Sequence, residues 1–355
     1  MSMSSLSSVG RRAAGAVRMP AAAWVQGGWM RREEAIMGTS ISVELWSEDP
    51  SAGNAAMDLV IGEMHRIDRG MSPHKPDSEL SRINREAAVR PVPLSEEMFV
   101  LLARSLEFSR RSEGAFDITF AGAGRLYDYR ERIRPTDAAL AQACAAVGHQ
   151  YLELDAAARS VRFARDGLRI DLGGFAKGHA VDNAAAILAR RGIRHAFISA
   201  GGDSRVIGDR RGRPWTIGVR DPRRPGEIVA LLPLEDAAVS TSGDYERYFD
   251  TPDGARCHHI LDPRTGKSPD SVRSVTIIAP DGLTSEALSK CLFVMGVERG
   301  LRFVESHAGV DAWWSTRRGR CTTRPDCSPP ARSRGSDTRT ASDSRSLNSP
   351  IRGPG

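Results

Sequence analysis

The stretch IDLGGFAKGHAVD at residues 170–182 joins a short apolar run to a helical run through two glycines. Its pattern predicts a strand that ends at Asp171, a tight turn at Gly173 and Gly174, and a helix that Lys177 opens. Backbone N–H groups and an ammonium at a helix N-terminus suit an anion, and the glycines let a ligand approach the backbone. An ordinary capped strand-to-helix turn explains the segment equally well, so both interpretations stay open on this stretch alone.

Strand-like and helix-like runs surround this stretch in clusters. Period-2 alternation or short apolar character predicts strands at 40–45, 151–155, 160–164, 168–172, 193–200, 215–219, 228–234 and 274–279. Apolar residues at helical spacing predict helices over 57–67, 95–114, 138–147, 176–191 and 283–296. Because strands and helices do not alternate regularly, the order favours an α+β fold with a mixed, mostly antiparallel sheet and packed helices.

The two ends of the chain differ in composition from the middle. Residues 1–30 are rich in Ser, Ala, Gly and Arg without a period and are expected to be a disordered leader, and 31–312 form one domain. Residues 313–355 have almost no aliphatic side chains and are expected to be disordered. A second interpretation is that the natural reading frame is lost near Ala312. Trp-Trp-Ser-Thr read one nucleotide earlier, with TCG for serine, gives Val-Val-Asp and would continue a buried strand, so one sequencing read distinguishes the two.

Charge and cysteine content exclude several classes of protein. The net charge of +6 resides in the tail from Trp313, which has nine Arg and three Asp, while the preceding part has 41 basic and 41 acidic residues. A nucleic-acid partner is therefore not expected, since its basic footprint belongs on a folded surface. Five cysteines without CxxC spacing indicate neither a disulfide framework nor a zinc site.

Localisation is expected to be cytoplasmic. The chain has no apolar run of membrane-spanning length, no compact signal peptide and no cysteine before Cys144 that could be acylated. A periplasmic or membrane-associated location is the alternative.

A second motif, HHILDPRTG at 258–266, places two histidines beside a predicted turn. Asp262 and Pro263 initiate the turn and Gly266 completes it. A histidine at such an edge can act as a general base, whereas a buried, hydrogen-bonded histidine is structural; we expect the structural role for His258. The following GKS is not a phosphate-binding loop, because its glycine pattern is incomplete, and no GxGxxG supports a Rossmann domain.

Five further motifs precede, separate or follow these two in a fixed order. They are MGT at 37–39, PDSELSRIN at 76–84, GAFDIT at 114–119, SAGGD at 199–203 and STSGDYERYF at 240–249. Each one alone is compatible with a turn or a helix cap. Their combination, from Met37 to Gly296, resembles the ApbE family of FAD:protein FMN transferases.

This resemblance implies an ApbE-like flavin transferase fold with a T-fold-like core, and a reaction. Family members bind FAD, use Mg²⁺ and transfer the FMN moiety through a phosphoester bond to a threonine of a target flavoprotein, with release of AMP. The resemblance implies that His259 is the catalytic base. The positions that it implies for FAD contacts are Met37, His74, Ala115, Phe116, Asp117, Asp171, Lys177 and Ile260. The positions that it implies for the metal are Gly174, Glu286 and Lys290.

The sequence departs from the family pattern at two of these positions. His74 stands where the family usually has an aromatic residue that can lie against the flavin or adenine. The family's D-A-L-x-T supplies a carboxylate and a hydroxyl to Mg²⁺, but here the run reads Glu286-Ala287-Leu288-Ser289-Lys290. A charged lysine has no lone pair for a metal. Either the two form an ordinary helical ion pair, or, as our sharper hypothesis, the Lys290 ammonium replaces Mg²⁺ at the pyrophosphate.

Three functions remain open on sequence grounds. The first is FMN transfer to a protein threonine, and the second is FAD hydrolysis by water to FMN and AMP. The third is FAD binding without catalysis, which the changes at His74 and Lys290 make worth testing. The target protein and the oligomeric state are not encoded in any motif of this chain.

Overall fold

The computed structural model describes residues 27–317 and 319–323. Its centre is an eight-stranded sheet in which every neighbouring pair is antiparallel. In spatial order the strands are β1 (Gly28–Ile36), β2 (Thr39–Ser47), β6 (Ala196–Ala200), β7 (Asp203–Ile207), β10 (Ala238–Gly243), β13 (Val272–Ala279), β14 (Asp311–Thr316) and β15 (Arg320–Thr322). The expected α+β fold is confirmed.

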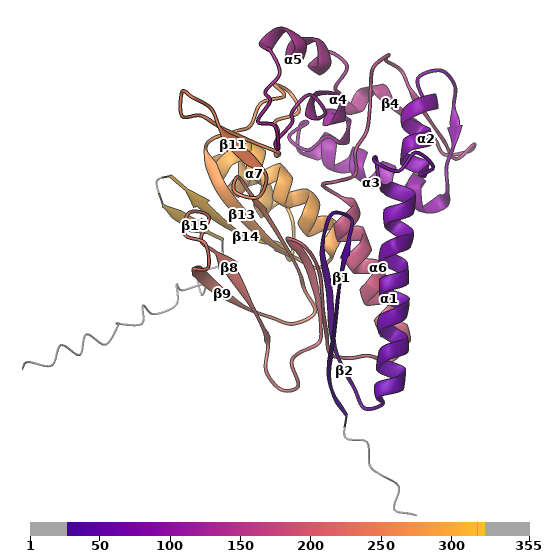
Figure 1. Cartoon of the computed structure of the whole chain (residues 1–355), viewed down its shortest axis with the longest axis vertical. Helices are drawn as coiled ribbons and strands as arrows, with labels where there is room; N and C mark the ends of the chain where they lie inside the picture. Colours follow the sequence, from indigo (N-terminus) through magenta and orange to yellow (C-terminus); the bar gives the residue numbers. More distant parts are fainter. Residues whose placement is uncertain (1–26, 318, 324–355) are drawn as a thin grey trace, which may run out of the picture.

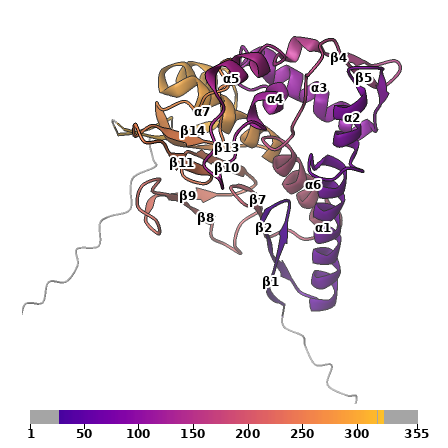
Figure 2. The ribbon, with the colours of Figure 1, turned by 45° about the horizontal axis from the view of Figure 1, so that its top comes forward.

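Three long helices cover one face of this sheet: α1 (Pro50–Met71), α6 (Ala176–Arg190) and α7 (Gly282–Glu305). Two further strands, β8 (Trp215–Arg220) and β9 (Ile228–Leu234), form a hairpin whose apolar side packs on the other face. Figure 2 shows the hairpin and the helices on opposite sides of the sheet. The sheet is therefore buried on both faces between a helical layer and a hairpin.

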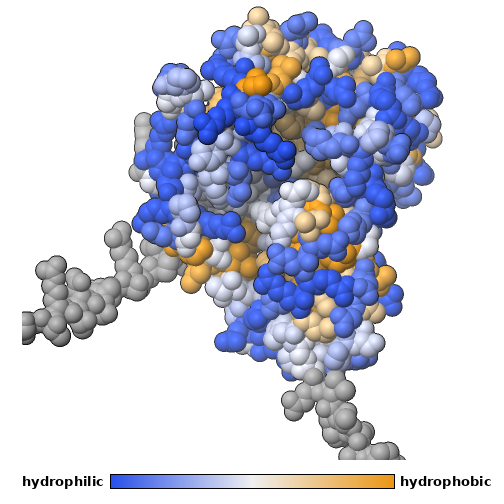
Figure 3. All heavy atoms as spheres, viewed as in Figure 1, coloured by the Kyte–Doolittle hydropathy of each residue, from blue (hydrophilic) through white to orange (hydrophobic). Residues whose placement is uncertain are grey.

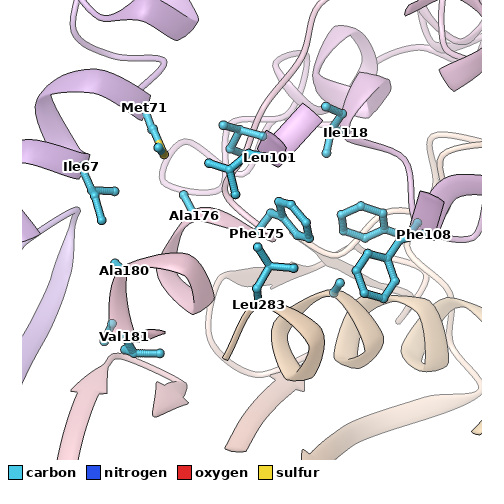
Figure 4. Close-up of a cluster of buried hydrophobic side chains, with 14 of the residues drawn as sticks. Ile67, Met71, Leu101, Phe108, Ile118, Phe175, Ala176, Ala180, Val181 and Leu283 are labelled. Carbon is cyan, nitrogen blue, oxygen red and sulfur yellow. The ribbon is translucent and has the colours of Figure 1, made fainter. Parts of the chain in front are cut away.

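A smaller, mostly helical part lies beyond the helical layer (Figure 2). It contains α2 (Glu79–Glu86), α3 (Glu96–Arg111), α4 (Ala121–Gly124) and α5 (Asp137–Cys144), with a small sheet of β3 (Val92–Pro93), β5 (Ser160–Phe163) and β4 (Leu152–Asp155). A further two-stranded ribbon consists of β11 (Tyr248–Asp250) and β12 (Arg256–His258). Figure 4 shows where α1, α3, α6 and α7 share one core, in which Phe108 and Phe175 lie edge to face at 6.0 Å.

Several sequence predictions are corrected by the structure. Residues 168–172 are not a strand, because their backbone is irregular and hydrogen-bonds to other loops, as between Asp171 N–H and Ile118 O at 2.9 Å. The domain also extends beyond 31–312 at both ends, because β1 begins at Gly28 and β15 ends at Thr322. The rest of the expected leader, 1–26, and of the expected tail, Arg318 and 324–355, lies outside the described residues.

The residues that follow Ala312 in this sequence belong to a buried strand, β14. Trp313 and Trp314 in β14 are 6% and 0% exposed, and β14 pairs with β13. Thus a different reading frame is not required for a buried strand to follow Ala312, and the frame itself stays a question for sequencing.

The surface of the face in Figure 3 is mostly hydrophilic, with hydrophobic residues in small separate patches. Among the described helices, none has both the length and the apolar character that a membrane span needs.

Candidate functional site

The N-terminus of α6 lies against the start of α7, and the two backbones approach closely. A Cβ added to Gly178 would lie 2.2 Å from the carbonyl oxygen of Gly282, so only glycine fits there. The cap residue of α6 is the apolar, buried Phe175, which makes no side-chain cap. Instead, the Gly178 N–H donates to Glu286 Oε2 at 2.7 Å. Glu286 of α7 thus supplies the carboxylate that the positive end of α6 attracts.

Four charged side chains meet at this junction, and we call Lys177, Asp203, Glu286 and Lys290 the charge quartet. The Lys177 ammonium donates to Glu286 Oε1 and to Gly173 O at 3.1 Å, and lies 2.9 Å from Asp203 Oδ2. The Lys290 ammonium lies 3.5 Å from Glu286 Oε1 and 4.0 Å from Asp203 Oδ1. Both carboxylates are buried, whereas both lysine side chains retain slightly more than a fifth of their exposure.

Burial and mutual attraction set the protonation of the quartet. Burial alone would lower the pKa of Lys177, but Asp203 and Glu286 raise it overall. Burial alone would raise the pKa of Asp203, but Lys177 and Lys290 lower it overall. Burial and the Asp203 carboxylate raise the pKa of Glu286. Both hydrogen-bond partners that the Glu286 side chain has in the described residues are donors, so we assign Glu286 as ionised at neutral pH.

The two histidines of the 258–266 segment have different surroundings. His258 ends β12, is 2% exposed, and its Nε2 lies 2.9 Å from Pro269 O, which fits the structural role expected for it. The backbone N–H of His259 donates to the backbone oxygen of Arg247 at 3.1 Å. The buried ring nitrogen Nδ1 of His259 has no hydrogen-bond partner among the described residues. Burial, then Lys290 and Arg247, lower the pKa of His259 to about 3. The ring is therefore neutral at physiological pH, and Lys290 lies near enough to influence it.

The turn between β1 and β2 lies close to Arg247, the residue whose backbone oxygen accepts the His259 backbone N–H. Met37 and Gly38 both have positive φ, at 54° and 70°, as a two-residue hairpin turn requires. A Cβ on Gly38 would lie 3.9 Å from Arg247 Nη2, so Arg247 lies between this turn and His259. A cavity of about 530 Å³ is lined by 35–39 together with His65, Asp68 and Lys75. His74 is exposed and precedes Lys75 in the loop after α1.

The remaining residues expected to contact FAD are mostly turned inward. Ala115, Phe116 and Ile260 are buried in the main core. Asp117 is also buried and accepts hydrogen bonds from the N–H of Thr119 and of His149, at 2.9 and 2.7 Å. These four positions can therefore offer a ligand mainly backbone groups.

Asp171 holds the glycine turn and connects two motifs. Its carboxylate accepts the Gly173 N–H at 2.6 Å, and its own N–H donates to Ile118 O. The 114–119 and 170–182 segments are thus brought together. The roles of all these residues toward FAD remain predictions.

The residues at the expected metal positions do not fit Mg²⁺. Lys290 packs along Gly174, where an added Cβ would lie 3.5 Å from Lys290 Cε, but an ammonium cannot ligate a metal. Both carboxylate oxygens of Glu286 accept hydrogen bonds from the protein. Of the four carboxylate oxygens in the charge quartet, Asp203 Oδ1 is the one with no hydrogen-bond partner among the described residues. A dication there would face two ammonium groups at short range. No group of three or more His, Cys, Asp or Glu in the described part of the chain is arranged to hold a metal.

Sequence reasoning missed two residues of this site. Asp203 lies in the SAGGD motif and Arg247 in the STSGDYERYF motif, but neither motif by itself predicts a role for these side chains. Asp203 begins β7, and its partners Lys177 and Lys290 are on α6 and α7. An acidic residue directly after a glycine pair at a strand start was the available signal for Asp203, and it is a weak one.

Comparisons with known proteins identify the family of this chain. The model of the ApbE family matches residues 37–314. A protein of Treponema pallidum named FAD:protein FMN transferase is 32% identical over 300 residues, which cover 79% of this chain and 83% of the relative. A protein of Klebsiella pneumoniae with the same name is 30% identical and covers 79% of this chain and 87% of its own length.

Solved structures give the same result for the fold. The ApbE protein of Thermotoga maritima superposes with a TM-score of 0.77 at 33% identity, over 84% of this chain and 97% of its own. The flavin transferase ApbE of Vibrio cholerae superposes with a TM-score of 0.74 at 27% identity, over 83% of this chain and 96% of its own. The expected ApbE-like fold is confirmed, and the chain belongs to the ApbE family.

Proposed function

We propose that this chain is an FAD:protein FMN transferase. It would bind FAD as a substrate, transfer the FMN moiety to a threonine of a target flavoprotein through a phosphoester bond, and release AMP. Family membership and the relatives named FAD:protein FMN transferase support the reaction class. The observation that carries the proposal to this site is the neutral His259, whose pKa burial and then the Lys290 and Arg247 cations lower.

The bond changes of the proposed reaction balance without a further reagent. The threonine oxygen attacks the phosphorus of the FMN half of FAD, and the bond from that phosphorus to the bridging oxygen breaks. The threonine proton passes to a ring nitrogen of His259, and AMP leaves with the bridging oxygen. A neutral ring is required for this step. A base whose pKa is about 3 is weak, but the negative pyrophosphate of bound FAD opposes Lys290 and Arg247 and raises that pKa.

Cationic groups near the pyrophosphate would stabilise the charge that develops on the bridging oxygen. Lys290 and Arg247 are the cations that influence His259, so they are placed to act on the same reacting group. The backbone around Gly173 and Gly174 would allow a phosphate to come close, since neither residue has a side chain.

Product analysis tests the proposal. The purified chain is incubated with FAD and a threonine-containing peptide from a protein known to carry phosphoester-linked FMN, and the products are separated by chromatography. Flavinylated peptide with equimolar AMP supports the transferase. Free FMN with AMP identifies a pyrophosphatase, and bound but intact FAD identifies a binding protein; either result contradicts the proposal.

A further inference from the structure

We propose that the Lys290 ammonium is the resident cation of the FAD pyrophosphate site, so that this chain binds FAD without Mg²⁺. The inference rests on the proposed function for the identity of the ligand. Its basis is a difference between the two lysines of the charge quartet. All three N–H donors of one ammonium have protein oxygens as partners, whereas the other ammonium makes no hydrogen bond to a protein oxygen among the described residues.

Lys177 is the saturated lysine. Its three N–H donors face three acceptors, namely Gly173 O, Asp203 Oδ2 and Glu286 Oε1. An ammonium has only three donors, so none is left for a ligand. The anion that the 170–182 stretch suggested is therefore present in the protein itself, as the Glu286 carboxylate bound by Lys177 and by the Gly178 N–H.

Lys290 has unused donors. Its distances of 3.5 and 4.0 Å to Glu286 and Asp203 are longer than the 2.7–3.2 Å of a good N–H···O bond. Within the described residues it makes ion pairs but no hydrogen bond. These carboxylates hold the ammonium in place without consuming its donors, and its partly exposed stem extends along Gly174 toward the surface. An incoming phosphate would find a positioned cation with free N–H groups.

The position of Lys290 also links it to the reacting group. After burial, the Lys290 charge is the largest cause that lowers the pKa of His259. One side chain can therefore contact the phosphate and, together with burial, keep the candidate base neutral before FAD binds. A divalent metal in the same place would need oxygen ligands that Lys290 does not offer and that Glu286 has already committed.

The test exchanges the cation type by one substitution. Lys290→Thr removes the ammonium beside Asp203 Oδ1, an oxygen with no hydrogen-bond partner among the described residues. The introduced hydroxyl and this carboxylate oxygen are donors suited to Mg²⁺. Lys290→Arg keeps the charge. Arg302→Thr is the matched control, because it removes a positive charge from the same helix at a side chain that is 63% exposed.

FAD affinity is measured by flavin fluorescence titration in EDTA and in Mg²⁺, after a thermal melt has shown that each variant is folded. We expect the wild type and Arg302→Thr to bind FAD with the same affinity, within about twofold, in both buffers. Lys290→Arg keeps the cation, so its affinity should not depend on Mg²⁺. We expect Lys290→Thr to bind at least about tenfold more weakly in EDTA, as for the loss of a charge-assisted hydrogen bond, and to regain affinity in Mg²⁺.

Two results of the FAD titration would overturn the inference while leaving the proposed function intact. One is wild-type FAD binding that requires Mg²⁺, and the other is Lys290→Thr binding that equals the wild type in EDTA. If the folded wild type binds no FAD in either buffer, the proposed function fails and this inference fails with it. A Mg²⁺-dependent rise in melting temperature without FAD, seen in the wild type, would also contradict it.

Discussion

Glu286→Gln perturbs the centre of the site while preserving the shape of the side chain. Glu286 is completely buried, its Oε2 accepts the Gly178 N–H at 2.7 Å, and its Oε1 accepts from the Lys177 ammonium. Glutamine keeps an acceptor for one of these donors but removes the negative charge. Asp203 would then be left as the only carboxylate of the quartet, facing both Lys177 and Lys290.

The expected cost follows from that charge imbalance. Removing one partner of a buried ion pair costs about 3–5 kcal/mol, because the other charge is left uncompensated. Lys177 retains Asp203 at 2.9 Å and the amide can still accept one hydrogen bond, so we expect the lower end, about 3 kcal/mol. At about 2–4 °C per kcal/mol, the melting temperature should fall by at least about 6 °C.

The assay is urea and thermal unfolding of wild type and variant, with Glu298→Gln as the matched control. Glu298 also lies on α7 and pairs with Arg302 at 3.0 Å, but its side chain is 88% exposed, so its loss should cost at most about 0.5 kcal/mol. A loss of less than 1 kcal/mol in Glu286→Gln, or one equal to that of the control, would refute the assignment of Glu286 as an ionised, saturated partner.

Three other changes test the helix junction, the C-terminal strand and the histidine. Gly178→Ala should destabilise the fold by about 3 kcal/mol in urea unfolding because its Cβ would collide with Gly282, while Gly62→Ala, in open space on α1, should stabilise it by up to about 1 kcal/mol. Trp314→Ala should cost about 3–5 kcal/mol, and a cost near zero would show that β14 is not part of the core. The pKa of His259 is about 3 in the folded chain and about 6.5 in the unfolded chain, so the unfolded chain binds more protons between these pH values. The free energy of unfolding should therefore fall by about 2 kcal/mol from pH 8 to pH 5. His259→Asn should remove most of that fall.

Local patterns in the sequence were enough to predict most of the elements. The alternation at 40–45 lies inside β2, and the helical spacing at 57–67 lies inside α1. Predictions failed where tertiary contacts decide the conformation. The apolar run 168–172 has strand-like composition, yet its backbone pairs with loops, as between Ile170 N–H and the Asn84 side chain at 2.8 Å.

The end of the domain was misjudged for a similar reason. Trp313 and Trp314 precede an arginine-rich, aliphatic-poor segment, so composition suggested that the fold had already ended. Pairing with β13 and burial against the core make these two residues part of the sheet, and neither effect is visible in a local window.

The candidate site was only partly predictable. Glu286 and Lys290 stood out because they occur one helical turn apart within a recognisable pattern. The ion pair between Lys177 and Glu286 could not be predicted from sequence. The two residues are more than a hundred positions apart, and they meet because α6 packs against α7. Asp203 depends in the same way on the placement of β7 between β6 and β10.

The most direct test of the central claim is the intact mass of the target peptide after incubation with FAD and the chain, for wild type and His259→Asn in parallel. We expect the wild type to add the mass of one FMN moiety at a threonine. His259→Asn should still bind FAD but label the peptide at least about a hundredfold more slowly. An unlabelled peptide with the folded wild type, or equal labelling rates for the two proteins, would contradict the proposed function and the role of His259.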